Sequence, residues 1–179
     1  MAQIVMRVVS GRFRGTRLDA VSGDKTRPTT DKVKEAMFSM LTPYLNGGEV
    51  LDLYAGTGGL SIEAVSRGMA HATLVDRQFQ AIKVIQNNIE KTHDIAAFTV
   101  IKSPAKQALE KFALARQQFD LVFLDPPYAK ETLRGDMRYM AENQLLAPQA
   151  IILVESDDDA NLPQEDQNFM IIQQKHYGI

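Results

Sequence analysis

Residues 49–64 read Glu49-Val-Leu-Asp52-Leu-Tyr54-Ala55-Gly56-Thr57-Gly58-Gly59-Leu-Ser-Ile-Glu63-Ala, and this stretch decides the fold. It begins as an apolar strand, breaks into a glycine loop and continues into a helix whose residues Leu60, Ala64 and Val65 share one face. Because glycine has no side chain, a ligand can approach bare backbone at the start of that helix. The order strand, glycine loop, helix therefore predicts a site for a nucleotide-containing cofactor.

The chemistry of this loop limits which cofactor it suits. The dinucleotide fingerprint G-x-G-x-x-G requires a third glycine where this chain has Ser61. The loop also opens with Asp52, whose negative charge suits a cationic cofactor better than a pyrophosphate. Asp76 lies 24 residues after Asp52 and ends the apolar segment 72–75, where it is placed to bind both ribose hydroxyls of an adenosine group. Dinucleotide enzymes and S-adenosylmethionine enzymes both use such an acid, so Asp76 alone does not distinguish between them.

A second motif, Asp125-Pro126-Pro127-Tyr128, follows the apolar run 121–124 directly. Proline cannot continue a hydrogen-bonded ladder, so the run predicts a buried strand that is forced to leave the sheet at this point. The turn places a carboxylate, a rigid carbonyl and an aromatic ring in one crevice. An Asp-Pro turn after a strand is common by itself, but the complete tetrad after a buried strand favours a functional site.

The tetrad suits a planar substrate that carries an amino group. The exocyclic amine of a nucleobase is a poor nucleophile, because its lone pair is delocalised into the ring. Asp125 and the carbonyl of Pro126 are two acceptors that favour a pyramidal, attacking nitrogen, and Tyr128 is placed to stack on the base. Hydride transfer has no use for such an amine site, whereas methyl transfer from a sulfonium needs a nucleophile held in line. The two motifs together therefore favour S-adenosylmethionine as the cofactor.

The rest of the chain alternates strand and helix patterns. Expected elements are a hairpin within 5–18, a helix capped by Thr29 or Thr30, strand 49–54, helix 58–67, strand 72–75, a helix over 82–89, strand 98–102, a helix entered by Pro104, strand 120–124, a helix within 131–146, and strands 150–154 and 169–175. This alternation predicts an α/β fold with a doubly wound, mostly parallel sheet. We expect a single domain over residues 1–179, in which 1–28 form a basic hairpin extension. Ligands of such sheets bind at the carboxyl ends of the strands, where Asp52, Asp76 and Asp125 fall.

Bulk composition excludes several classes of protein. The chain has 179 residues, no cysteine and no apolar run of membrane-spanning length, and its N-terminus lacks the apolar region of a signal peptide. The three histidines, His71, His93 and His176, lie far apart and adjoin no acidic pair. We therefore expect a cytoplasmic, monomeric enzyme that uses no metal.

The charge distribution points to a nucleic-acid partner, although the net charge of −2 does not. Residues 1–34 hold eight basic and three acidic residues, a net charge of +5, whereas the remainder carries −7. A basic arm on an acidic body is typical of a protein that contacts phosphates at one edge. On charge alone, however, a run of charged residues is more often a solvated terminus. Apolar alternation around Val5, Val8, Phe13 and Leu18 predicts a small hairpin in place of a loose tail.

Four segments in this order resemble the RsmD family. They are Arg7-Val-Val-Ser-Gly-Arg-Phe-Arg-Gly, Thr26-Arg27-Pro28-Thr29-Thr30-Asp31-Lys32-Val33-Lys34-Glu35-Ala36, Asp52-Leu-Tyr-Ala-Gly-Thr-Gly-Gly-Leu and Asp125-Pro-Pro-Tyr. The resemblance covers nearly the whole chain. It implies a Rossmann-like, class I S-adenosylmethionine-dependent methyltransferase from a bacterium, which modifies N2 of one guanine in small-subunit (16S) ribosomal RNA.

The resemblance also implies roles for individual residues. The catalytic set would be Asp125, Pro126, Pro127 and Tyr128, which hold the guanine. The cofactor would be bound by Asp52, Tyr54, Ala55, Gly56, Thr57, Gly58, Asp76, Arg77 and Ser103, with Thr26, Arg27, Pro28 and Thr29 at the mouth of the site. The RNA would be bound by Arg7, Arg12, Arg14, Arg17, Lys25 and Lys32.

This chain departs from the family pattern at two places. Ser103-Pro104 stands where such enzymes usually carry an acid that accepts a hydrogen bond from the adenine amine. The chain also stops at Lys175-His176-Tyr177-Gly178-Ile179, where the family continues into a final strand. We therefore expect that final strand to be missing and the strand at 169–175 to have an open edge.

Two other functions fit the same motifs. A DNA or protein amino-methyltransferase can use the same Asp-Pro-Pro-Tyr tetrad, and methyl incorporation into naked DNA but not into ribosomal subunits would favour this alternative. A non-catalytic RNA-binding module on the same fold would bind RNA without transferring a methyl group at saturating cofactor.

Overall fold

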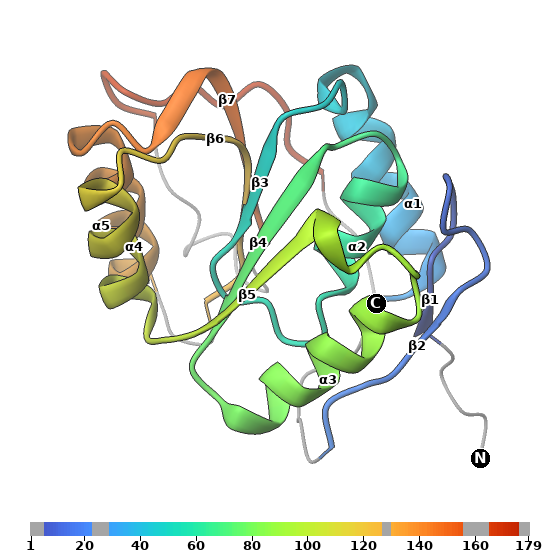
Figure 1. Cartoon of the computed structure of the whole chain (residues 1–179). Coiled ribbons are helices and arrows are strands. Elements are labelled where there is room, and N and C mark those ends of the chain that lie inside the picture. The colour runs from blue at the N-terminus through green and yellow to red at the C-terminus, as the bar shows by residue number, and fades with distance from the viewer. Residues whose placement is uncertain (1–5, 23–28, 127–129, 156–164, 176–179) are drawn as a thin grey trace.

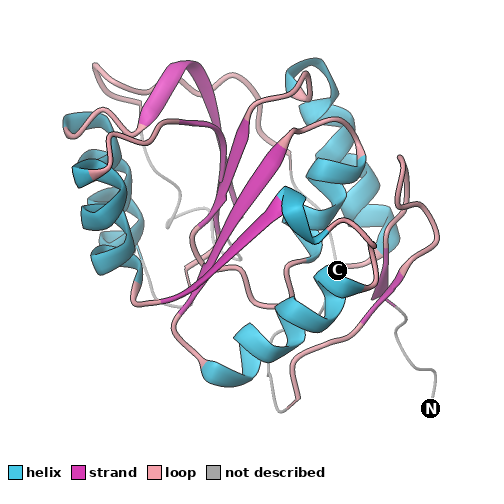
Figure 2. Cartoon of the chain, in the orientation of Figure 1, coloured by secondary structure: helices cyan, strands magenta, loops and turns pink. Residues whose placement is uncertain are grey.

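A computed structural model of the chain describes residues 6–22, 29–126, 130–155 and 165–175, with Lys130 and Glu131 described in backbone only. Its centre is a parallel sheet of five strands (Figures 1 and 2). They are β3 (Glu49–Asp52), β4 (His71–Asp76), β5 (Phe98–Lys102), β6 (Phe119–Leu124) and β7 (Leu146–Val154), in the spatial order β5-β4-β3-β6-β7. The strand order reverses beside β3, which pairs with β4 on one side and β6 on the other.

Helices cover both faces of this sheet. In Figure 1, α1 (Asp31–Leu41), α2 (Gly59–Ser66) and α3 (Phe79–Glu90) lie on one side, and α4 (Ala105–Leu114) and α5 (Lys130–Glu142) lie on the other. A short 3₁₀ turn, η1 (Thr42–Tyr44), follows α1, and a second one, η2 (Ile95–Ala97), precedes β5. Two buried apolar clusters match these two layers, with Val50 of β3 in one and Leu51 in the other. Such burial on both faces explains why the central strands have nearly continuous apolar sequences.

An N-terminal hairpin of β1 (Met6–Arg7) and β2 (Arg17–Leu18) packs on the α1–α3 layer. Val8, Phe13 and Leu18 are buried in the same apolar cluster as α1, α2 and α3. Glu63 of α2 is fully buried, and its carboxylate accepts hydrogen bonds from the backbone N–H groups of Val9 (2.9 Å) and Ser10 (3.0 Å). The hairpin is therefore docked on the domain by both apolar and polar contacts.

Buried charges reinforce this junction. The carboxylate of Glu63 lies 2.8 Å from Arg67 Nε and 3.6 Å from Lys34 Nζ. Lys34 Nζ also donates to the carbonyl oxygen of Arg7 at 2.8 Å. Burial lowers the pKa of Lys34, and the nearby charge of Glu63 partly opposes that shift. Lys34 is one of the eight basic residues counted in 1–34, but it lies in α1 and is buried. Its amine binds Arg7 and so attaches the hairpin to the domain.

The observed architecture confirms the doubly wound, mostly parallel sheet and the N-terminal hairpin. Thr30 is the cap of α1 and accepts a hydrogen bond from Val33 N–H at 3.3 Å. The prediction of a strand at 169–175 is wrong, since residues 165–175 contain no strand. Backbone donors there bond to nearby side chains instead of a ladder: Phe169 N–H to Asp166 at 3.0 Å and Ile171 N–H to Glu165 at 2.8 Å.

Some predicted site residues lie outside the described residues. These are the catalytic pair Pro127 and Tyr128, the residues Thr26, Arg27 and Pro28 at the mouth of the site, and Lys25 of the RNA-binding set. Their proposed roles remain predictions. Among the described residues, none of the helices combines the length and the apolar character needed to cross a bilayer.

Candidate active site

Three carboxylates meet at the carboxyl edge of the sheet. Asp52 ends β3, Asp76 ends β4, and Asp125 directly follows β6. Asp52 lies opposite Phe123 of β6 in the ladder. Burial raises the pKa of Asp52 to about 7; the negative charges of Asp125 and Asp76 act in the same direction, and the hydrogen bond from Ser61 opposes them. This edge therefore carries a negative field that suits a cation.

The glycine loop presents bare backbone beside these acids. Gly58, at the start of α2, has a φ of +82°, and a Cβ there would lie 3.1 Å from Leu74 Cδ2. Gly56 has a φ of +58°, and a Cβ there would meet nothing within 4 Å. One glycine is thus required by conformation and packing, and the other leaves open space above the backbone. Such a loop forms a cradle for a ligand at the N-terminus of α2.

Asp76 holds the loop and keeps acceptor capacity for a ligand. Its Oδ2 accepts from the N–H of Gly56 at 3.0 Å, and its Oδ1 accepts from the N–H of Gln78 at 2.9 Å. A carboxylate has about four lone-pair sites. Two of these remain for other donors, such as the two hydroxyls of a ribose, and the ribose role itself stays a prediction.

Asp52 differs from Asp76 because it is almost completely buried. Its side chain accepts a hydrogen bond from Ser61 Oγ at 2.8 Å, across the glycine loop and into the first turn of α2. Asp52 therefore shapes the loop and contributes charge beneath it. Ser61 stands at the position where the dinucleotide fingerprint has a glycine, so the missing glycine has a structural use here.

Tyr54 joins the glycine loop to the helix that follows the Asp-Pro-Pro-Tyr segment. Its hydroxyl donates to the carboxylate of Asp136 in α5. Asp136 is buried, and burial raises its pKa as well as that of Tyr54. The sequence predicts Tyr54 in the cofactor site but does not single out Asp136. An acid within the apolar face of α5, between Leu133 and Met137, was the available signal.

Asn88 of α3 is a second polar residue that the sequence reasoning missed. It is fully buried, its Nδ2 donates to the carbonyls of Thr57 (2.9 Å) and Asp19 (3.1 Å), and its Oδ1 accepts from Asp19 N–H at 2.8 Å. This one amide thus connects the glycine loop with the segment that follows the hairpin. The signal was a polar residue in the apolar stripe formed by Ile85 and Ile89.

The remaining predicted cofactor residues lie around the same edge. Ser103 donates its backbone N–H to the carbonyl of Asp76 at 3.0 Å, so it lies next to the acid that is predicted to bind ribose. Its hydroxyl donates to the carbonyl of Pro104 at 2.9 Å. Arg77 is exposed, and Ala55 N–H donates to Val75 O at 2.9 Å. Thr29 precedes the cap residue of α1. The contacts of these residues with the cofactor remain predictions.

The predicted RNA-binding residues fall into two groups. Arg7 and Arg12 already face carboxylates: Arg7 Nε lies 2.8 Å from Asp31, and Arg12 Nη1 lies 2.6 Å from Asp94. Other members of the set are exposed and have no ion pair with any described residue. They are Arg14, Arg17 and Lys32.

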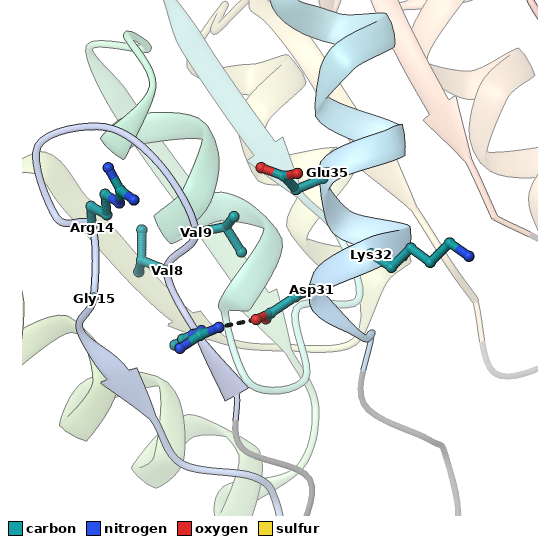
Figure 3. Close-up of a pocket in the computed structure, with 8 residues that line it drawn as sticks. Val8, Val9, Arg14, Gly15, Asp31, Lys32 and Glu35 are labelled. Atoms are coloured by element: carbon teal, nitrogen blue, oxygen red, sulfur yellow. Dashed lines mark hydrogen bonds and ion pairs between the residues drawn. The ribbon is translucent and has the colours of Figure 1, made fainter.

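A cavity of about 470 Å³ lies between the hairpin and the start of α1 (Figure 3). The Arg7–Asp31 ion pair crosses it, and Figure 3 shows Lys32 extending from α1 away from the hairpin. Its other lining residues are Val8, Val9, Arg14, Gly15, Lys32 and Glu35. None of the three strand-end carboxylates lines this cavity, so it is separate from the glycine-loop cradle. Its lining holds three basic and two acidic residues, so it is only a weakly basic candidate surface for the RNA backbone.

Comparison with known proteins gives consistent matches over nearly the whole chain. The model of the family described as "Conserved hypothetical protein 95" matches residues 6–179. "Putative rRNA methyltransferase YlbH" of Bacillus subtilis (strain 168) is 41% identical over 97% of this chain and 95% of its own length. "Ribosomal RNA small subunit methyltransferase D" of Escherichia coli (strain K12) is 32% identical over 97% of this chain and 85% of its own. The solved structure titled "Putative methyltransferase yhhF from Escherichia coli" superimposes with a TM-score of 0.83 at 31% identity, covering 97% of this chain and 92% of that one.

Proposed function

The chain belongs to the RsmD family, and on that basis we propose that it transfers a methyl group from S-adenosylmethionine to N2 of a guanine in small-subunit (16S) ribosomal RNA. The names of its relatives support ribosomal RNA methylation. The choice of the exocyclic amine rests on Asp125 and Pro126 of this chain. The choice of cofactor rests on the three carboxylates and the glycine loop.

The observation that carries the proposal is the meeting of Asp52, Asp76 and Asp125 at one edge of the sheet. S-adenosylmethionine supplies an electrophilic methyl group on a positively charged sulfur. The negative field of these acids favours such a cation, and the open space above Gly56 admits it against the backbone. In this proposal Asp76 binds the ribose, and Ser103, whose N–H donates to the Asp76 carbonyl, lies near the adenine.

The chain's part in the reaction is to position the amine. The carboxylate of Asp125 and the carbonyl of Pro126 accept hydrogen bonds from the two amine N–H groups. These contacts direct the nitrogen lone pair toward the methyl group and strengthen as positive charge develops on the nitrogen. The Tyr54–Asp136 hydrogen bond ties the cofactor loop to α5 and so supports the relative position of the two halves of the site.

The decisive experiment is incubation with labelled S-adenosylmethionine and undermethylated small ribosomal subunits, followed by nucleoside analysis. We expect the label in N2-methylguanosine. Label in another nucleoside would contradict the substrate atom, and label in naked DNA but not in subunits would favour a DNA methyltransferase. RNA binding without transfer at saturating cofactor would identify a non-catalytic module.

The hairpin cations give a separate prediction. Replacement of Arg14 and Arg17 together by alanine should weaken RNA binding and make the plot of log affinity against log salt shallower by roughly 0.7 to 0.9 for each phosphate that is no longer neutralised. Arg14 and Arg17 are chosen because both are exposed, whereas Arg12 is paired with Asp94 and helps to dock the hairpin. Filter binding over a salt series measures the slope.

The matched control removes Arg116 and Arg138, two exposed arginines associated with α4 and α5. This control has the same net charge as the test variant but leaves the hairpin intact. Its salt slope should match that of the wild type. Equal slopes for both double variants, with unchanged circular dichroism, would show that the hairpin arginines do not contact RNA.

A further inference from the structure

An exposed aromatic ring lies beside the candidate cofactor site. Phe79 is the first residue of α3, three positions after Asp76, and its side chain is 63% exposed. Figure 1 shows α3 beginning just below the end of β4. Lys83, one turn later, places its Nζ 5.5 Å from the centroid of the Phe79 ring. A single exposed apolar residue is ordinary by itself, so the surroundings of Phe79 decide its meaning.

Those surroundings are basic. The segments 77–87 and 101–109 contain no acidic residue, although the chain as a whole has a net charge of −2. All four cations in these segments are exposed, and none has an ion pair with a described residue: Arg77, Lys83, Lys102 and Lys106. Lys83 lies beside the exposed ring, and the other three cations stand at or just after the ends of β4 and β5, apart from the hairpin.

The backbone brings these cations to one edge. Lys102 ends β5 and is the ladder partner of Asp76, so it lies directly beside the end of β4. Lys106 lies in the first turn of α4, which follows β5. We call Phe79, Lys83, Lys102 and Lys106 the Phe79 surface. It borders the carboxyl ends of β4 and β5, next to the acid proposed to bind ribose.

The Phe79 surface and the hairpin lie at opposite ends of α3. Near the C-terminal end of this helix, Asn88 binds Asp19 and Lys91 forms an ion pair with Asp19 at 2.9 Å. A helix of 12 residues is about 18 Å long, so the two basic surfaces are separated by roughly that distance along α3. They are therefore two separate contact points.

We propose that the Phe79 surface binds a single-stranded segment of the RNA that flanks the target guanine, with an unpaired base stacked on Phe79 and phosphates next to the lysines. This inference rests on the proposed function, since it assigns a second contact for the same substrate. Exposed aromatic rings interleaved with cations are the usual means of holding unpaired nucleotides, because every base has a face that can stack.

The charge of the surface favours RNA over the cofactor as its ligand. S-adenosylmethionine carries no phosphate, and its single carboxylate does not account for the three exposed lysines of this surface. They would also repel its positively charged sulfur. RNA supplies both a stacking face and phosphates, which accounts for the ring and the cations together.

The test uses Phe79→Ala, Phe79→Trp and the double variant Lys102→Ala/Lys106→Ala. Binding to undermethylated small-subunit RNA should weaken roughly tenfold in Phe79→Ala, the scale of losing one stacked base, and should be retained in Phe79→Trp. The lysine variant should have a salt slope shallower by about 0.7 for each phosphate that its lysines no longer neutralise, the value for single strands. In methyl transfer, Phe79→Ala should raise the KM for RNA and leave kcat at saturating RNA unchanged.

Two matched controls lie at the far end of α4. Leu114 is 87% exposed, so Leu114→Ala also truncates an exposed apolar side chain, and Lys111→Ala removes an exposed lysine. Both should bind RNA like the wild type. The rise in melting temperature caused by S-adenosylmethionine should be the same in all variants, because the Phe79 surface is assigned to RNA.

Three results would overturn the inference. The first is RNA binding by Phe79→Ala and by the lysine variant that equals binding by the controls. The second is loss of the stabilisation by S-adenosylmethionine in Phe79→Ala, which would make Phe79 part of the adenine site. The third is weaker binding to assembled subunits with unchanged binding to naked RNA, which would indicate a contact with ribosomal protein. If the wild-type protein binds RNA through this surface but forms no N2-methylguanosine, the proposed reaction is refuted and the inference about the surface is retained.

Discussion

Replacement of Asp125 by alanine is expected to lower kcat by roughly 100-fold or more, while the affinity for S-adenosylmethionine changes little. That is the scale of loss when a preorganised hydrogen bond to the transition state is removed. Asp125 directly follows β6, a strand whose residues from Leu121 to Leu124 are buried. The packed sheet therefore fixes the backbone position from which the Asp125 side chain extends. Single-turnover methyl transfer to undermethylated subunits measures the chemical step.

Asp125→Asn separates charge from shape. Asparagine keeps an amide oxygen that accepts one hydrogen bond, but it lacks the negative charge that opposes the developing positive charge on the amine. We expect Asp125→Asn to fall between the wild type and Asp125→Ala. Both variants should retain the rise in melting temperature caused by S-adenosylmethionine, which is the control for an intact cofactor site. Wild-type turnover in Asp125→Ala would eliminate the assigned role.

Replacement of Asp52 by asparagine is expected to have opposite effects on stability and on cofactor binding. Burial raises the pKa of Asp52 from 3.8 to about 7, so between these two pH values the folded protein binds the proton more tightly than the unfolded chain does. The stability of the cofactor-free protein therefore falls as pH rises through this window, and above pH 7 the buried charge carries its full cost. Asparagine resembles the protonated acid and still accepts the hydrogen bond from Ser61.

The measurement is thermal unfolding without cofactor at pH 5 and pH 8. At pH 8 the Asp52→Asn variant should melt several degrees above the wild type, since about 1 kcal/mol corresponds to roughly 2–4 °C in a protein of this size. At pH 5 the difference should be smaller but still present, because most of the window between 3.8 and 7 lies above pH 5. A variant less stable than the wild type at pH 8 would contradict the assigned cost of the buried charge.

Cofactor binding should show the reverse order. Ionised Asp52 attracts the cationic cofactor, so the wild-type affinity for S-adenosylmethionine should rise between pH 6 and pH 8, whereas Asp52→Asn should bind weakly with a flatter pH dependence. Ser61→Ala removes a hydrogen bond that lowers the pKa of Asp52, so it should move the wild-type midpoint to higher pH. NAD should not stabilise any of these proteins, and equal stabilisation by NAD would refute the choice of cofactor.

The carboxyl edge of the sheet was predictable from sequence because its signals are local. Asp52, Asp76 and Asp125 each follow an apolar run, and parallel strands bring such ends together without any knowledge of side-chain contacts. The contacts that support the edge were not predictable. Tyr54 and Asp136 are 82 residues apart, and Asn88 reaches Thr57 across 31 residues, so no local pattern connects them.

The wrong strand at 169–175 has a similar explanation. Its apolar sequence has strand propensity, but a strand also needs a neighbour with free backbone groups, and the carboxylates of Glu165 and Asp166 bind the local N–H groups first. Lys34 shows the converse case. Its charge suggests exposure to solvent, and its burial is explained by partners distant in sequence, the carboxylate of Glu63 in α2 and the carbonyl of Arg7 in the hairpin.

The anchoring of the hairpin has a consequence for the order in which the protein is made. The backbone N–H groups of Val9 and Ser10 bind Glu63, 54 and 53 residues later in the chain, and Phe13 N–H binds Ser66 Oγ at 2.9 Å. During synthesis the arm leaves the ribosome long before its anchor exists. In the nascent chain the arm is therefore an unattached basic peptide. Its arginines take up fixed positions only once α2 has been translated and has folded against it.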